Sequence, residues 1–140
     1  MSIEENKAFV HRYLSADANE IRNSKTEVND EYHSPDLKVH SPTGDMNLTE
    51  YMDFMDVLVS AFPDCKYNAE DVIAEGDKAV CRYSFTGTHK GAFRHIPPTG
   101  KKISVEGIGI FKISGGKIVE VWFATDRMGM MQQLGAIPSR

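Results

Sequence analysis

Asp126 is the acidic residue best placed in the sequence for acid–base chemistry. It follows an apolar run, residues 118–125, that is typical of a β-strand rather than of a charged surface segment. Strand alternation puts Asp126 on the same face as Ile118 and Trp122. A carboxylate beside an indole in a dry pocket has its charged form disfavoured, so its pKa rises and it can exchange protons near neutral pH. The alternative is that Asp126 caps a helix expected over residues 127–134, a role that Asp often fills.

Two histidines extend this candidate catalytic site. His40 ends a short predicted strand and His89 ends a strongly alternating one. Either imidazole could hydrogen-bond a ligand, act as a general base or serve as a satisfied structural histidine. The histidines and cysteines of the chain lack the spacing of a zinc site, so we expect no metal. The sequence also has no phosphate-binding loop and no dinucleotide-binding fingerprint, so no motif predicts a cofactor.

Large apolar side chains are candidates for the wall of a small-molecule pocket. Trp122 is the only tryptophan, and a two-residue turn at residues 115–116 would place it opposite Gly109, where an indole has room. Methionine and aromatic residues at these spacings are equally typical of core packing. The predicted substrate-binding residues are Tyr13, Met55, Phe62 and Trp122.

Helices in the first half of the chain and strands in the second must position these residues. Helical spacing of apolar residues and two capping patterns, Ser2 with Glu5 and Asn47 with Glu50, predict the first two helices. The helices are expected over residues 2–22, 47–62 and 127–134, and the strands over 37–40, 67–75, 79–88, 103–113 and 117–126. This order predicts an α+β fold, with helices packed on one face of a strongly curved antiparallel sheet that can enclose an apolar cavity.

Length and composition fit one soluble domain over residues 1–140. The chain is 41% hydrophobic, and its net charge of −4 argues against a general nucleic-acid binder. No apolar run approaches the ~20 residues of a membrane span, and the acidic start is unlike a secretory signal. Cys65 and Cys81 form no Cys-x-x-Cys pattern and are expected to be buried thiols. We therefore expect a cytoplasmic protein with no nucleic-acid or membrane partner.

Several motifs follow one another in the order and spacing of a known protein family. They are Phe62-Pro63-Asp64, Glu75-Gly76-Asp77, Gly87-Thr88-His89-Lys90-Gly91-Ala92-Phe93, Ile96-Pro97-Pro98-Thr99-Gly100, Gly116-Lys117-Ile118-Val119-Glu120-Val121-Trp122, Asp126 and Gln132-Gln133-Leu134-Gly135. Over residues 33–137 the sequence resembles the SnoaL-like polyketide cyclase (ester cyclase) family.

The resemblance implies a fold, an assembly and a catalytic residue. The fold would be that of the nuclear transport factor two-like superfamily, a cone-shaped α+β barrel that is often dimeric through its sheet, so a homodimer is expected. In the characterised cyclases a pocket aspartate acts as acid and base in an intramolecular aldol condensation, without a cofactor or metal. That aspartate lies four residues after the tryptophan, which corresponds to Asp126 here.

The leading functional hypothesis is a cofactor-independent, polyketide cyclase-like enzyme that acts on a small hydrophobic carbonyl compound. Asp126 would remove a proton alpha to the carbonyl and return it to the new oxygen, while His40 or His89 would hydrogen-bond the enolate. One alternative is a non-catalytic protein that binds an apolar metabolite in the same cavity. Another is a hydrolase or isomerase on the same fold.

Overall fold

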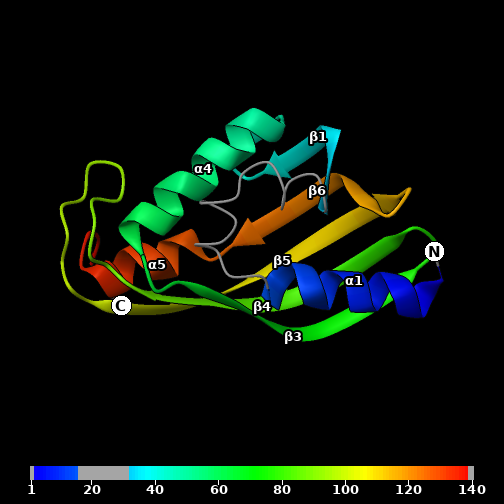
Figure 1. The fold of residues 1–140 in the computed structure, drawn as a ribbon. Coiled ribbons are helices and arrows are strands. Elements are labelled where there is room, and N and C mark those ends of the chain that lie inside the picture. Colours follow the sequence, from blue (N-terminus) through cyan, green and yellow to red (C-terminus); the bar gives the residue numbers. More distant parts are fainter. Residues whose placement is uncertain (1, 16–31, 139–140) are drawn as a thin grey trace.

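The computed structural model describes residues 2–15 and 32–138 of the chain. In these residues three helices pack against a six-stranded sheet (Figure 1). The helices are α1 (Ile3–Ser15), α4 (Leu48–Ala61) and α5 (Arg127–Leu134). The strands are β1 (His33–Ser41), β2 (Gly44–Met46), β3 (Lys66–Glu75), β4 (Lys78–Thr88), β5 (Lys102–Ser114) and β6 (Lys117–Thr125). Residues 16–22 of the predicted first helix lie outside the described residues.

The sheet is curved, mostly antiparallel and open. Its strand order is β2-β1-β6-β5-β4-β3, and every neighbouring pair is antiparallel except β1 with β6. The predicted α+β fold with helices on a strongly curved sheet is confirmed. The sheet does not close into a barrel, because β2 and β3 form its two edges.

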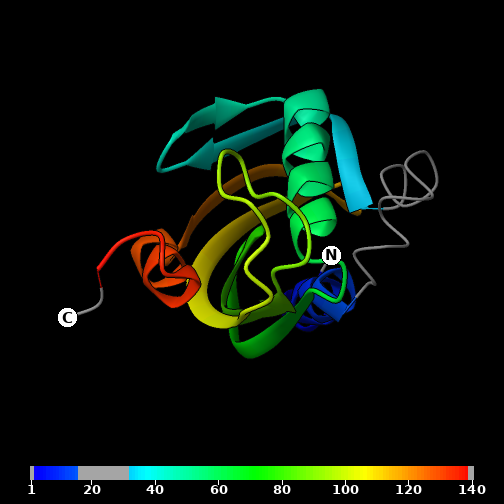
Figure 2. The ribbon, with the colours of Figure 1, turned by 90° about the vertical axis from the view of Figure 1, so that its left-hand side faces the viewer.

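Helices α1 and α4 lie on the inner side of the curve. α1 packs on β3 and β4, α4 packs on β1 and β2, and α5 packs on β5. Figure 2 shows the strands curving past α4 and α1. None of the helices in the described segments is long and apolar enough to span a bilayer. Cys65 and Cys81 are both buried thiols, as predicted.

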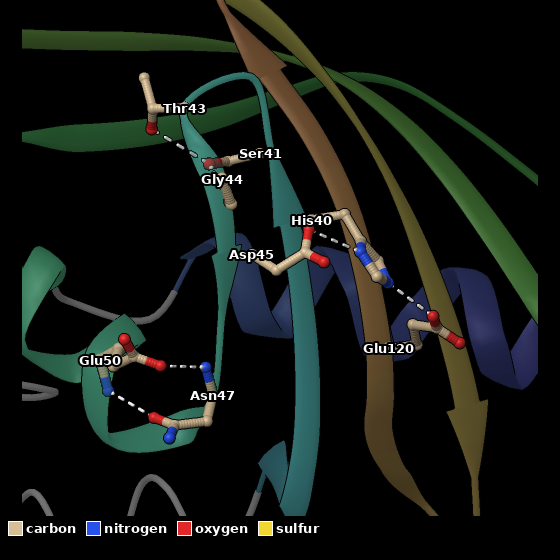
Figure 3. Close-up of polar contacts among 8 residues, drawn as sticks. All are labelled: His40, Ser41, Thr43, Gly44, Asp45, Asn47, Glu50 and Glu120. Carbon is tan, nitrogen blue, oxygen red and sulfur yellow. Dashed lines mark hydrogen bonds and ion pairs between the residues drawn. The ribbon is translucent and has the colours of Figure 1, made fainter.

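The predicted capping pairs are found at the N-termini of both α1 and α4. Ser2 Oγ accepts from the Glu5 amide and Glu5 Oε1 accepts from the Ser2 amide, each at 3.1 Å. Asn47 and Glu50 exchange the same two bonds at 2.9 and 3.0 Å (Figure 3). These caps satisfy amide groups that a helix leaves without partners in its first turn.

A β-bulge in β6 reverses the alternation of its side chains. Ile118 pairs with Ile113, whereas Glu120 pairs with Lys112, so Val119 is an extra residue in β6. Because successive side chains of a strand point to opposite faces, one extra residue exchanges the two faces from that point onward. Ile118 is buried, but because it precedes the bulge its burial cannot be used to predict which later residues of β6 point inward.

Trp122 consequently points away from the inner face of the sheet. Val121 and Phe123 on either side of it line an inner cavity, so Trp122 belongs to the outer face. It pairs with Ile110, and the predicted pairing with Gly109 is wrong by one residue because of the bulge.

Candidate functional site

A cavity lies between the concave face of the sheet and helices α1 and α4. It leaves about 80 Å³ for the centres of water-sized atoms. One water molecule needs roughly 10–15 Å³ on this measure, so there is room for several waters or a small organic molecule. Aromatic side chains dominate its wall: Tyr13, Tyr51, Phe54, Tyr67, Tyr83, Phe85, Phe93, Phe111 and Phe123.

Several polar side chains of the wall are joined by short hydrogen bonds. The Tyr13 hydroxyl lies 2.8 Å from Nε2 of His33 and 3.1 Å from the Tyr51 hydroxyl. The Tyr83 hydroxyl lies 2.7 Å from Oγ1 of Thr125. All of these residues except His33 line the cavity. They form two hydrogen-bonded polar groups in a wall that is mostly apolar.

Burial keeps the cavity phenols protonated. It raises the pKa of Tyr83 to about 12, raises that of Tyr51, and raises those of Tyr13 and Tyr67 well above the ordinary value. A neutral phenol can donate a hydrogen bond to a carbonyl oxygen and to the oxyanion that forms from it. The cavity can therefore stabilise developing negative charge on a bound carbonyl compound.

His33 supports Tyr13 from behind the cavity wall. Its side chain is buried, and burial lowers its pKa to about 4, so the imidazole is neutral at pH 7. Nδ1 has no hydrogen-bond partner among the residues that the structure describes. His33 could not be predicted as a site residue, because it lies in a polar stretch, residues 23–36, that is typical of a loop or a frayed helix.

Gly107 makes room for the Tyr83 ring. A Cβ atom at this position would lie 2.6 Å from ring and hydroxyl atoms of Tyr83, which is too close for any side chain. A glycine inside a strand pattern often marks such a close approach. This signal could have pointed to a ring packed across β5, although not to which ring.

Of the predicted substrate-binding residues, Tyr13 and Met55 line the cavity, from α1 and α4. Phe62 does not. It is completely buried, and its ring centre lies 5.9 Å from that of Phe85 and 5.8 Å from that of Phe93. The predicted place of Phe62 in the pocket wall is wrong, because the chain turns at the end of α4 and carries this ring into the core beyond the cavity.

His89 is buried but does not line the cavity. It is hydrogen-bonded to the loop between β4 and β5. Its Nδ1 accepts a hydrogen bond from the Thr99 amide at 3.2 Å, and its own amide donates to the Lys101 carbonyl at 2.9 Å. Burial lowers its pKa. The predicted contact of His89 with an enolate is not found in this geometry, since the ring packs on Phe62, with centres 5.4 Å apart.

His40 lies on the outer face of the sheet, stacked on Trp122 with ring centres 5.3 Å apart. Its Nε2 lies 2.6 Å from Glu120 Oε2 and its Nδ1 lies 3.0 Å from Asp45 Oδ1 (Figure 3). The bonds to Glu120 and then to Asp45 raise the pKa of His40. His40 and Trp122 are therefore not together with Tyr13 and Met55, contrary to prediction, because strand alternation directs them to the opposite face.

The raised pKa of His40 predicts a pH dependence of stability. A group whose pKa is higher in the folded than in the unfolded chain stabilises the fold fully below its unfolded pKa, near 6.5, and loses that effect as the pH rises through the folded pKa. Between about pH 5 and pH 9, the midpoint temperature of thermal unfolding should therefore fall less on the alkaline side for His40→Gln than for the original protein. An NMR titration should give His40 a pKa above 6.5 that falls in Glu120→Gln. An unchanged pKa in that variant would contradict the assigned cause.

Asp126 is exposed and does not line the cavity. It is the N-cap of α5, and its Oδ1 accepts from the Gly129 amide at 2.8 Å. The predicted burial beside Trp122 is therefore wrong, and the alternative role as a helix cap is present. Both sequence neighbours, Thr125 and Arg127, do line the cavity, so Asp126 stands at its edge. The catalytic role of Asp126 stays a prediction.

Within residues 2–15 and 32–138 the structure contains no cluster of three or more side chains suited to hold a metal ion.

Comparison with solved structures shows the same fold in several bacterial proteins. AclR from Streptomyces galilaeus, provisionally assigned as a hydroxylase, has a TM-score of 0.84 and 24% identity, with 99% of this chain and 86% of that chain covered. A provisionally assigned SnoaL-like polyketide cyclase from Jannaschia sp. CCS1 has a TM-score of 0.80 and 24% identity, with coverage of 99% and 97%. A provisionally assigned polyketide cyclase from Acidithiobacillus ferrooxidans has 29% identity and a TM-score of 0.76, with coverage of 97% and 99%.

Comparison at the level of sequence places the chain in a family. No curated protein gives a significant match. The family model described as SnoaL-like polyketide cyclase matches residues 12–134, which include all of the cavity-lining residues in the described part of the chain. The protein therefore belongs to the SnoaL-like polyketide cyclase family.

Proposed function

We propose that the protein is a cofactor-independent enzyme that enolises a small hydrophobic carbonyl compound, as a cyclase does before forming a new bond. Family membership supports an enzyme of the cyclase type. The observation that carries the finer proposal is the set of buried, protonated tyrosines in an apolar cavity. These groups suit a ligand that is apolar apart from an oxygen that accepts hydrogen bonds.

In this proposal the tyrosine hydroxyls bind the carbonyl oxygen. As the proton leaves the neighbouring carbon, negative charge moves to that oxygen, and donors such as Tyr51 and Tyr83 stabilise it in a cavity with a mostly apolar wall. The hydrogen bond from a phenol to an oxyanion is stronger than that to the neutral carbonyl. The tyrosines therefore lower the barrier rather than only binding the substrate.

Asp126 is the acid and base of this proposal. It would take the proton alpha to the carbonyl and, in a cyclisation, return it to the oxygen of the newly attacked carbonyl group. Its Oδ1 is used by the helix cap, whereas Oδ2 makes no hydrogen bond in the part of the chain that the structure describes. This second oxygen is the one available for proton transfer.

Hydrogen–deuterium exchange at the α-carbon of β-tetralone, followed by NMR in deuterated buffer, tests the proposal directly. We expect saturable acceleration over buffer, lowered in Tyr83→Phe and unchanged in His40→Gln, which alters only the outer face. If neither β-tetralone nor an aryl β-ketoester is accelerated, although both bind, the non-catalytic binding protein is the correct alternative.

A further inference from the structure

We propose that the end of the cavity beside α5 is a subsite for a carboxylate, with Arg127 as the group that contacts it and Arg94 as a second positive charge nearby. The proposal deepens the proposed function and rests on it only for the position of the ligand in the cavity. It narrows the substrate class from carbonyl compounds in general to keto acids with an apolar ring system.

Arg127 is the only charged side chain among the described residues that line the cavity. It is half-buried. The ion pairs found in the described residues join His40 to Asp45 and to Glu120, and Arg82 to Glu106, so none of them neutralises Arg127. A guanidinium that is partly withdrawn from water and has no carboxylate partner has unused hydrogen-bond donors and charge.

Arg94 adds to the positive potential at the same end of the cavity. Its guanidinium carbon lies 5.7 Å from the centre of the Phe93 ring, and Phe93 lines the cavity. Arg94 has a φ of 54°, a left-handed backbone that residues other than glycine rarely adopt. Burial, and after it the positive charge of Arg94, lowers the pKa of Arg127. An anion bound near both would be attracted by two positive charges.

A carboxylate suits this end of the cavity better than a neutral group does. The planar guanidinium of Arg127 can donate two parallel hydrogen bonds to a carboxylate, which gives orientation as well as affinity. Tyr13 and Tyr51, which line the cavity from α1 and α4, carry neutral hydroxyl donors that suit a ketone oxygen. The two kinds of donor would therefore bind a ligand with a carboxylate at one end and a ketone at the other.

Calorimetric titration with matched pairs of probes tests the subsite. The pairs are benzoate with benzamide and naphthoate with naphthamide, which differ in charge but hardly in shape. We expect each acid to bind at least about tenfold more tightly than its amide, and Arg127→Gln to abolish this preference. Arg94→Gln should reduce it by a few fold. Arg82→Gln, which removes the same charge from the outer face, should leave it unchanged.

A second variant keeps the test decisive if Arg127→Gln folds poorly. Arg127→Lys retains the charge but not the paired donors, so it should keep a reduced preference for the acids. Equal binding of acid and amide, an unchanged preference in Arg127→Gln, or no binding of either pair overturns the subsite. If the acid preference fails while β-tetralone exchange is still accelerated, the proposed function stands. If the preference is found without any exchange, the proposed function fails and the subsite stands.

Discussion

Replacing Asp126 with Asn is expected to lower the rate of carbonyl α-exchange by about 10²–10⁴-fold, the usual contribution of a general acid–base group. The stability of the fold should hardly change. Asn caps helices as well as Asp does, so the hydrogen bond to the Gly129 amide can be kept while the group that transfers the proton is lost. Exchange kinetics and thermal unfolding of the same preparation measure both effects.

Two further variants at position 126 separate catalysis from capping. Asp126→Ser also keeps a capping oxygen, and it should be as inactive and nearly as stable as Asp126→Asn. Asp126→Ala removes the cap as well and should cost about 1 kcal/mol of stability in addition to the lost activity. Full activity in Asp126→Asn would show that Asp126 serves α5 alone and that the proton is moved by another group.

Replacing Phe62 with Ala is expected to destabilise the protein by about 3–5 kcal/mol. The ring is completely buried between Phe85, Phe93 and His89, so its removal leaves a cavity that these neighbours cannot fill without moving. A loss of this size is a large part of the ~5–15 kcal/mol that stabilises most domains. Urea unfolding of the variant measures it.

Phe54→Ala is the matched control for this prediction. Phe54 is only partly buried and lines the cavity, so its loss should weaken the binding of an apolar ligand and destabilise the fold less than Phe62→Ala. If Phe62→Ala were as stable as the original protein and affected ligand binding alone, Phe62 would be a wall residue, as the sequence first suggested.

The helices and strands could be predicted from the sequence because local signals mark them. The capping pair at Asn47 and Glu50 places the start of α4, and Gly135 adopts the left-handed conformation that ends α5. The three-residue strand β2 (Gly44–Met46) is too short to show alternation and was not predicted. The expected homodimer and cytoplasmic location stay predictions.

The site was harder to predict, because one residue decides which side chains point inward. Counting by twos from Ile118 assigns Trp122 and Asp126 to the buried face, and the count fails at the bulge formed by Val119. No residue type in this segment marks a bulge. Beyond the bulge the side chains of β6 alternate regularly, but each points to the face opposite to the one that the count assigns.

Partners distant along the chain were also beyond the reach of local patterns. The hydrogen bond between Tyr13 and His33, residues twenty positions apart in the sequence, joins α1 to β1. Tyr83 packs on Gly107 only because β4 and β5 pair in this register. Each partner is an ordinary residue in its own segment. The two members of each pair meet only when the sheet brings them together.

The position of Trp122 determines what fluorescence can report about this protein. Its indole is stacked on His40 and has the Lys78 ammonium 5.4 Å from its ring centre, with the sheet between it and the cavity. Tryptophan emission is therefore a natural indicator of the ionisation of His40, because a protonated imidazole quenches an indole in contact with it. A ligand entering the cavity would instead be detected through the absorption of the phenol rings that surround it.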